Sequence, residues 1–306
     1  MYDIIIIGGG AAGLTAAVYA RRAEKKVLVL EKGTFGGQIV WSSNVENFPG
    51  VTSVSGMKLA DRLKAHALTV GAELQLQEVT EVIKNDNSFR VRTQLSDEFD
   101  AKALIFATGS APRHLGLPGE ETLIGSGISF CAVCDGEFFR GSNVAVVGGG
   151  NTAFQEALYL SDICSNVHLI HRRSGFRADQ SLIDHIARRS NIHLHYPAEV
   201  ISLLGTDQLQ GVTILSREAA PDKIINLAVN GLFVAVGHAP QTRLVTAFAD
   251  LDEYGYVLAD ESTRTKTAGI FVAGDCRKKN VKQLTTAVSD GSCAAIAACH
   301  YLDRLS

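Results

Sequence analysis

The sequence predicts an α/β fold with two similar three-layer domains, and three observations support this fold class. Two segments align without gaps at an offset of 140 positions, with Asp3 opposite Asn143. Each segment runs from a short apolar stretch through three glycines and a helix-like stretch to a second apolar stretch, which is the pattern of a βαβ unit. The length of 306 residues gives room for about two domains.

The composition is typical of a globular protein and excludes several other classes. Apolar residues form 46% of the chain and charged residues 20%, which leaves ample material for buried cores. The net charge of −3 gives no basic excess for nucleic acid or for an anionic membrane surface. The run from Ile4 to Ile7 is far shorter than the ~20 apolar residues of a membrane span, and it predicts a buried strand rather than a signal peptide. We therefore expect a cytoplasmic protein.

Further elements are expected outside the two repeats. Apolar periodicity predicts a helix over about 55–70, strands at 88–93, 103–109, 230–237 and 269–275, and an Ala-rich helix over about 285–301. Pro112 and Pro118 make 110–119 a predicted linker. If the last strand and helix return to the first domain, the second domain is an insertion. Composition alone does not decide this.

The glycines of both repeats have the spacing of a dinucleotide-binding turn. Gly8, Gly10 and Gly13 form G-x-G-x-x-G, and the second repeat has G-x-G-x-x-A with Gly148, Gly150 and Ala153. The first glycine permits the tight turn, the second lets backbone amides approach a pyrophosphate, and the third position lets helix and strand pack closely. The alternative, two glycine-rich turns without a ligand, fits poorly with a motif that occurs twice in the same strand–helix context.

The two repeats differ at the strand end where nucleotide specificity is set. The first has Glu31, whose carboxylate can accept hydrogen bonds from a ribose diol. The second has His171, followed by Arg172, Arg173 and Arg177, and guanidinium groups can pair with a 2′-phosphate. The first repeat is therefore predicted to bind a dinucleotide with a free ribose diol, and the second NADP(H). The alternative for the arginines is a solvated basic face.

Two of the six cysteines, Cys131 and Cys134, have the C-x-x-C spacing that allows a redox disulfide at the start of a helix. A zinc site would need further ligands at metal spacing, and no second such pair exists, so no metal is expected; an inert buried pair is the other alternative. Asp135 is a candidate proton donor or acceptor for the thiols, or a simple helix cap. The other cysteines are expected to be small buried hydrophobes: Cys164, Cys276, Cys293 and Cys299.

Motifs along the whole chain resemble the low-molecular-weight, bacterial-type thioredoxin reductases, class II of the pyridine nucleotide-disulfide oxidoreductases. They are, in order, GGGAAGLTAA (8–17), GGQ (36–38), ENFPG (46–50), ATG (107–109), CAVCDG (131–136), GGGNTA (148–153), HRRSGFR (171–177), GLFVAVGHAPQT (231–242) and GIFVAGD (269–275). The resemblance implies two Rossmann-like, FAD- and NAD(P)-binding three-layer domains, the second inserted into the first. The FAD domain would comprise 1–112 and 243–306, and the NADPH domain, with the cysteine pair, 113–242. It also implies a homodimer that reduces thioredoxin.

The resemblance carries a set of expected site residues. Those for FAD are Gly8, Gly10, Ala12, Gly13, Glu31, Lys32, Gly36, Gly37, Gln38, Asn47, Thr108, Gly109, Gly274, Asp275, Lys282, Gln283 and Leu284. Those for NADPH are Gly148, Gly150, Asn151, Thr152, Ala153, His171, Arg172, Arg173 and Arg177. The chain departs from the family pattern at Val133, where Thr is more usual, and at Lys282-Gln283, where Arg-Gln is common. Lysine keeps the charge but not the forked geometry of arginine.

The expected reaction passes electrons from NADPH through FAD to the Cys131–Cys134 disulfide and on to thioredoxin. Cys134 is expected to lie next to the flavin, and Cys131 to attack the protein substrate through a mixed disulfide. Because the nicotinamide and the disulfide would share one domain and need the same flavin, we expect the inserted domain to rotate about the two crossovers.

Other functions are compatible with parts of the pattern. A reductase of another thioredoxin-like or peroxiredoxin-linked protein would look the same in sequence. A dithiol oxidase or ferredoxin-driven relative has usually lost the second nucleotide motif, which is intact here. A ferredoxin–NADP reductase would not need Cys131 and Cys134. A flavin-binding redox sensor without rapid turnover is a further alternative from another class.

Overall fold

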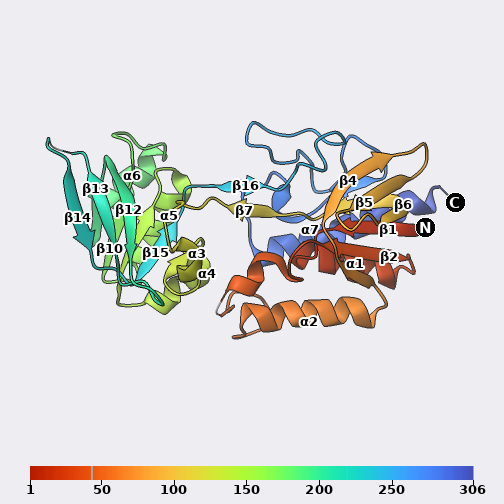
Figure 1. Ribbon diagram of the computed structural model, residues 1–306, viewed down its shortest axis with the longest axis horizontal. Coiled ribbons are helices and arrows are strands. Elements are labelled where there is room, and N and C mark those ends of the chain that lie inside the picture. The colour runs from red at the N-terminus through yellow and green to blue at the C-terminus, as the bar shows by residue number, and fades with distance from the viewer. Residues whose placement is uncertain (43, 219, 306) are drawn as a thin grey trace. The chain divides into compact units, whose positions relative to one another are not determined.

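The computed structural model describes residues 1–42, 44–218 and 220–305. The chain forms two compact units, one made of Met1–Ala111 with Ala239–Ser306 and the other of Pro112–His238 (Figure 1). The first unit is therefore discontinuous in sequence, and the second is inserted into it. The crossings lie close to the expected positions, with the return a few residues before 242–243. Among the described residues, no helix is both long and apolar enough to cross a membrane.

The first unit is built on a seven-stranded sheet in the order β3-β2-β1-β6-β5-β4, with β17 also paired to β6. Its strands are β1 (Tyr2–Ile7), β2 (Val27–Glu31), β3 (Glu73–Leu76), β4 (Val79–Lys84), β5 (Phe89–Thr93), β6 (Glu98–Phe106) and β17 (Ile270–Val272). Its helices are α1 (Ala11–Arg22), α2 (Gly56–Thr69) and α7 (Leu284–Asp303), with short 3-10 turns η1 (Gly37–Trp41) and η3 (Gly274–Cys276). The strands β3, β2, β1, β6 and β17 are parallel, whereas β5 and β4 are antiparallel.

The alternation of side chains along β1 divides the core of the first unit into two layers. Ile4 and Ile6 pack with residues of α1 and α7 on one face. Ile5 and Ile7 pack on the other face with apolar residues of the segment 244–259. All four isoleucines are buried, as expected for a parallel strand covered on both faces.

The second unit has a five-stranded parallel sheet in the order β11-β10-β9-β15-β8 and a separate three-stranded antiparallel sheet, β12-β13-β14. The strands are β8 (Ile128–Ser129), β9 (Asn143–Val147), β10 (Asn166–Ile170), β11 (Ile192–His195), β12 (Ala198–Leu204), β13 (Gly211–Ser216), β14 (Lys223–Leu227) and β15 (Gly231–Val234). The helices are α3 (Glu120–Leu123), α4 (Ala132–Asp135), α5 (Asn151–Ser161) and α6 (Gln180–Ala187), with the 3-10 turn η2 (Gly136–Phe139). One face of the parallel sheet packs on α5 and α6, and the other on the antiparallel sheet.

The predicted α/β class with two Rossmann-like three-layer units is confirmed, and the predicted helices 55–70 and 285–301 correspond to α2 and α7. Ser55 caps α2 by accepting a hydrogen bond from the amide of Lys58 at 3.3 Å. The predicted linker at 110–119 was wrong in part. Its beginning forms β7 (Ser110–Pro112), which pairs with β16 (His238–Pro240), so that the two crossing segments run side by side (Figure 1).

The glycine at the third motif position is required by packing within the first unit. A Cβ atom on Gly13 would lie 1.9 Å from the carbonyl oxygen of Gly8. Gly10 differs, because a Cβ there would meet nothing closer than 3.9 Å. The first turn of α1 therefore lies directly on the end of β1, with space left at the second motif position.

We expect Gly13→Ala to destabilise the first unit by about 1–3 kcal/mol, the usual cost of forcing extra atoms into a packed site. Gly10→Ala is the matched control and should unfold like the parent in ligand-free protein. Urea unfolding followed by the fluorescence of Trp41, the single tryptophan, reports on this unit. Equal unfolding midpoints for the two variants would contradict the packing argument.

Candidate functional site

The first glycine-rich turn joins β1 to α1 and leaves room for a ligand at its centre. Gly8 has a φ of 107°, and a Cβ there would lie 2.3 Å from the carbonyl oxygen of Ala107 on the neighbouring strand end. Gly10 precedes the helix with space around it, and Ala12 is buried in the first turn of α1. The backbone amides at the start of α1 lie at the positive end of the helix dipole, and this arrangement suits a pyrophosphate.

Glu31 lies at the end of β2 with its carboxylate against the glycine turn. Its oxygens accept hydrogen bonds from the amides of Gly9 at 2.6 Å and Gly33 at 2.8 Å. A carboxylate can accept about four hydrogen bonds, so Glu31 keeps the capacity to accept from a ribose hydroxyl. Lys32, the next residue, is exposed.

A second glycine turn lies beside the first. The amide of Gly36 donates to the carbonyl oxygen of Gly9 at 2.8 Å, and both Gly36 and Gly37 have positive φ angles. The Gln38 side-chain amide donates to the carbonyl oxygen of Ser110. Asn47 is exposed on a bend within 46–50. The structure thus brings Gly36 and Gly37 to the first turn by direct contact.

Asp275 presents a buried oxygen without a hydrogen-bond partner among the described residues. It is the second residue of η3, directly after β17, and its Oδ1 lies 3.6 Å from the Lys279 ammonium. A buried acceptor of this kind costs free energy unless a donor reaches it, so the site suits a ligand hydroxyl. Thr108 and Gly109 follow β6, and the Thr108 hydroxyl donates to the carbonyl oxygen of Gln241 at 2.5 Å.

An ion-pair cluster that the sequence analysis missed fixes the backbone next to Asp275. Asp290, on α7, is only 6% exposed and accepts from the amide of Gly274 at 3.0 Å. Its carboxylate also pairs with Arg277 at 2.7 Å and with Lys279 at 3.0 Å. The cluster holds the turn that carries Asp275 against the start of the C-terminal helix. Only the amphipathic pattern of that helix could have pointed to Asp290, and its partners come from tertiary packing.

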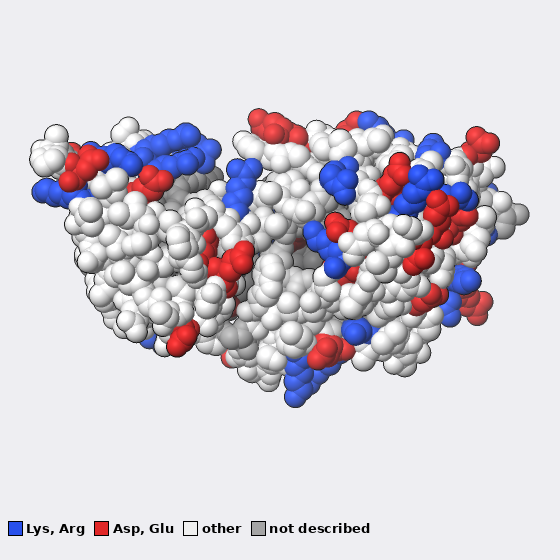
Figure 2. Space-filling view, in the orientation of Figure 1, with Lys and Arg blue, Asp and Glu red and all other residues white. Residues whose placement is uncertain are grey.

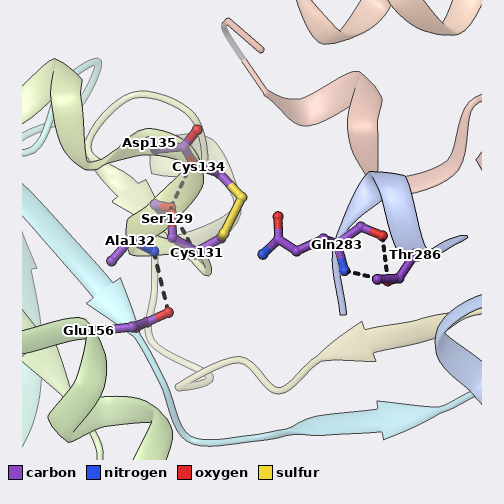
Figure 3. Close-up of a disulfide and its surroundings, with 8 residues drawn as sticks. All are labelled: Ser129, Cys131, Ala132, Cys134, Asp135, Glu156, Gln283 and Thr286. Atoms are coloured by element: carbon purple, nitrogen blue, oxygen red, sulfur yellow. Dashed lines mark hydrogen bonds between the residues drawn. A yellow bond between two sulfur atoms is a disulfide. The ribbon is translucent and has the colours of Figure 1, made fainter. Parts of the chain in front are cut away.

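The segment Lys282–Leu284 leads into α7. The Lys282 ammonium lies over the ring of Tyr256, 3.4 Å from its centroid, and burial lowers the pKa of this lysine. The amide of Gln283 donates to the Thr286 hydroxyl at 3.0 Å, which closes the helix start (Figure 3). The lysine charge is therefore held in place by an aromatic ring instead of by a forked ion pair.

The second glycine-rich turn joins β9 to α5 and repeats the geometry of the first. Gly148 has a φ of 159°, and a Cβ there would lie 2.5 Å from the carbonyl oxygen of Ala235. A Cβ on Gly150 would meet nothing within 4 Å, whereas Ala153 is fully buried. Thr152 is exposed beside the turn. A space for phosphate therefore exists at the same position as in the first turn.

The arginines after β10 surround this second turn. The backbone amide of Arg177 donates to the carbonyl oxygen of Gly149 at 2.7 Å, which fixes the loop on the turn. Arg172, Arg173 and Arg177 are exposed, and within 1–42, 44–218 and 220–305 none of their guanidinium groups has an acidic partner. Figure 2 shows Lys and Arg side chains gathered over the part of this unit that contains α6. A cluster of unpaired guanidinium groups favours an anionic ligand.

His171 and Asn151 have structural partners in this loop. His171 is buried against Gly149, its Nε2 lies 3.1 Å from the carbonyl oxygen of Gly175, and burial lowers the pKa of its ring. Asn151 and Asp179 bond each other through side chain and backbone at 2.8 and 2.9 Å. The imidazole is therefore neutral near pH 7 and shapes the loop, while the arginines supply the charge.

Cys131 and Cys134 form a disulfide with Cα atoms 5.3 Å apart (Figure 3). Cys131 caps the N-terminus of α4, and the amide of Asp135 donates to its carbonyl oxygen at 3.1 Å. Both cysteines are half-buried, so the pair is not sealed in a core. Among the described residues no cluster of three or more His, Cys, Asp or Glu side chains could hold a metal ion.

Asp135 is half-buried beside the disulfide, and at the N-cap position of η2 its side chain makes no capping hydrogen bond. Its Oδ2 accepts a hydrogen bond from the Ser129 hydroxyl at 2.7 Å, and its Oδ1 is buried without a hydrogen-bond partner among the described residues. Burial raises the pKa of this carboxyl, and the bond from Ser129 opposes the rise. The capping alternative for Asp135 is wrong, and its position suits proton transfer to a thiol.

A second carboxyl beside the disulfide, Glu156, was missed by the sequence analysis. It lies on α5, and its Oε1 accepts from the amide of Ala132 at 3.3 Å (Figure 3). Burial raises the pKa of Glu156 to about 7. In the sequence it is one polar residue of an amphipathic helix, and nothing local marks it as buried.

The four remaining cysteines are free thiols. Cys164, Cys276 and Cys299 are buried as expected, but Cys293 is exposed on α7, so the prediction of a buried side chain was wrong there. The buried positions of α7 near it are occupied by Asp290, Gly291, Ala294 and Ala295, so the helical period turns Cys293 outward.

Comparisons with known proteins agree with this geometry. The family model of the pyridine nucleotide-disulphide oxidoreductases matches residues 2–291. A thioredoxin reductase of Treponema pallidum is 39% identical over 305 residues, covering 99% of this chain and 98% of that protein. A bifunctional thioredoxin reductase/thioredoxin of Mycobacterium leprae is 38% identical, covering 99% of this chain and 66% of that protein.

Solved structures show the same relationship. The crystal structure of thioredoxin reductase from Streptococcus pyogenes superposes with a TM-score of 0.92 at 36% identity, covering 99% of both chains. The match covers nearly all of both units. With its disulfide and its two glycine-rich turns, this chain belongs to the pyridine nucleotide-disulphide oxidoreductase family and, within it, to the bacterial-type thioredoxin reductases.

Proposed function

We propose that this protein is an NADPH-dependent flavoprotein that reduces the disulfide of thioredoxin through Cys131 and Cys134. The main support for the proposal is that the second unit contains both a disulfide and a glycine-rich turn. That unit holds a formed C-x-x-C disulfide and an open glycine turn, and the loop on that turn carries three exposed arginines. One unit thus combines a redox couple with a site suited to a phosphorylated nucleotide.

FAD is proposed for the first unit. The space at Gly10 fits a pyrophosphate, and the Glu31 carboxylate can accept from a ribose diol. The Oδ1 of Asp275, which accepts no hydrogen bond from any described residue, suits a hydroxyl of the ribityl chain. The other residues that we propose to line the cofactor are Gly36, Gly37, Gln38, Thr108, Gly109, Gly274, Lys282, Gln283 and Leu284. When bound, FAD accepts a hydride equivalent from NADPH and supplies two electrons to a disulfide.

NADPH is proposed for the second unit. The pyrophosphate would lie at the start of α5, against the amides that follow Gly150. The guanidinium groups of Arg172, Arg173 and Arg177 would pair with the 2′-phosphate, which NADH lacks. His171 would position the loop and contribute no charge of its own near neutral pH.

The thiols are proposed to act in a fixed order. After two-electron reduction of the pair, the Cys131 thiolate attacks the thioredoxin disulfide, forms a mixed disulfide and releases one thioredoxin thiolate, which takes a proton. The Cys134 sulfur then attacks Cys131, restores the intramolecular disulfide and releases the second thioredoxin thiol. Asp135 would exchange a proton with Cys134 during this cycle, since its half-buried carboxyl lies on the same short helix.

Sharing of one flavin requires movement. The nucleotide and the disulfide would both belong to Pro112–His238, and the flavin to the rest of the chain. We propose that the second unit rotates about the paired crossing strands β7 and β16 so that each donor or acceptor reaches the flavin in turn. The Mycobacterium leprae relative, whose name joins both proteins, supports thioredoxin as the partner. By family likeness we also propose a homodimer.

Replacement of Cys134 by Ser should stop thioredoxin reduction and leave reduction of bound flavin by NADPH intact, because only the second electron transfer needs this sulfur. Stopped-flow absorbance of the flavin and a thioredoxin-coupled assay give the two rates. Cys293→Ser, which changes an exposed free thiol, is the control and should leave both rates unchanged. Thioredoxin turnover in the Cys134→Ser protein would contradict the assignment. If the parent instead reduces only glutaredoxin-like or peroxiredoxin substrates, the partner is one of those.

The double change Arg172→Ala/Arg173→Ala should raise KM for NADPH at least about tenfold, because a hydrogen bond to a charged group contributes about 1.5–3 kcal/mol. The KM for NADH should stay within about twofold. Arg188→Ala changes an exposed arginine of the same unit and serves as control. Steady-state kinetics with both nucleotides measure the ratio, and an equal rise for NADH would contradict 2′-phosphate recognition.

Asp275→Ala should lower the flavin content of the purified protein, because the ribityl hydroxyl would lose its acceptor. The absorbance ratio of flavin to protein and the Kd for added FAD measure the effect, for which we expect at least about tenfold weaker binding. Asp250→Ala removes an exposed carboxylate that pairs with Lys266 and should retain FAD fully. Unchanged FAD affinity in the Asp275 variant would contradict this role.

A further inference from the structure

Glu156 is a half-buried residue at the redox centre whose carboxyl the proposed cycle does not use. Its Oε1 bonds the amide of Ala132, the residue that follows Cys131 within the ring closed by the disulfide (Figure 3). Its Oε2 is buried and has no hydrogen-bond partner among the described residues. Ala132 itself is fully buried. The carboxyl is thus in direct contact with the backbone of the disulfide ring.

We propose that Glu156 is a second proton-holding group of the redox centre, which takes up a proton when the Cys131–Cys134 disulfide is reduced and releases it on reoxidation. The inference rests on the proposed redox role of the cysteine pair. Helix α5 would then contribute Glu156 to the thiol chemistry and its N-terminal amides to the proposed nucleotide site.

The proton balance of the step is simple. The S–S bond breaks as the pair takes two electrons from its reductant, which is NADPH through flavin in the enzyme. One sulfur takes a proton and becomes a thiol, and the other stays a thiolate. The second proton resides on the Oε2 of Glu156, so that no second negative charge stands beside the thiolate in a region of low dielectric.

Among the described residues, one hydrogen bond opposes the effect of burial on the Glu156 carboxyl. Burial raises the pKa of its carboxyl to about 7, and only the amide of Ala132 opposes the rise. Titratable groups on the elements packed against α5 are Cys131 just before α4, Cys134 and Asp135 on α4, Glu137 on η2, His168 on β10, and Asp184 and His185 on α6, whereas β9 has none. Asp184 and His185 are exposed, and none of these groups contributes to the pKa shift of Glu156.

The sign of the coupling follows. With the disulfide intact, Glu156 is about half protonated near pH 7. A thiolate nearby disfavours the carboxylate, so reduction raises the pKa further and draws in a proton. Above pH 7 the parent pair should therefore become harder to reduce with rising pH, by up to about tenfold per pH unit beyond the ordinary dependence of a dithiol. Below pH 6 the carboxyl is neutral in both states and has no effect.

Redox titration of the flavin-loaded full chain tests this. The protein is equilibrated with mixtures of reduced and oxidised dithiothreitol from pH 5.5 to 8.5 without NADPH, and the cysteine pair is quantified by acid quench, alkylation and mass spectrometry. Parent and Glu156→Gln should have equal reduction equilibria at low pH. By pH 8 the variant should be several-fold easier to reduce, because the amide keeps the bond from Ala132 but holds no charge. Glu137→Gln changes an exposed carboxyl of the same unit and should follow the parent.

The outcomes are distinct. Parallel pH dependences of the parent and Glu156→Gln overturn the inference. A parent disulfide that cannot be reduced at all overturns the proposed function instead. If the Gln variant does not fold, redox-difference infrared spectra of the parent decide between the alternatives. A carboxyl C=O band that persists in Asp135→Asn and grows on reduction supports the inference, and no such band overturns it.

Discussion

Both units depend on the close contact between the first turn of a helix and the end of the strand before it. In the first unit this contact leaves no space for a Cβ on Gly13, and in the second Ala153 is fully buried at the same place. The contact aims the amides of the helix start at the space beside Gly10 or Gly150. Because the strand, the turn and the helix share this one junction, the direction of the helix and the space at its start are set together.

The two turns share this backbone geometry and differ in the charge placed beside it. Glu31 brings a negative charge to the first turn, and three exposed arginines bring positive charge to the second. The same repeat thereby presents one site suited to a ribose diol and one suited to a phosphate ester. Specificity in this molecule lies in a few side chains at the ends of β2 and β10, on a scaffold that is the same in both units.

Much of the fold could be predicted from the sequence because its signals are local. The two βαβ repeats, α2 and α7 are each specified by apolar periodicity within a short segment, and the cysteine pair by its spacing. The antiparallel sheet from β12 to β14 was not predicted. Its strands are buried by contact with the parallel sheet, and the sequence of each strand alone does not show that contact. The roles of Asp290 and Glu156 were missed for a related reason. In the sequence each is an ordinary polar residue of a helix, and only its tertiary partners reveal its role. Cys293 shows the converse, since the general tendency of free cysteine to be buried does not tell which face of a helix a given cysteine occupies.

The pairing of the two crossing strands has a consequence for modularity. The amide of Arg113 bonds the carbonyl oxygen of Gly237 at 2.9 Å, and the amide of Gln241 bonds that of Gly109 at the same distance. The chain therefore leaves the first unit and returns to it at neighbouring points, which are one pair of hydrogen-bonded strands apart. A unit inserted in this way can be deleted as one continuous segment, and a short linker is enough to rejoin the two ends of the first unit.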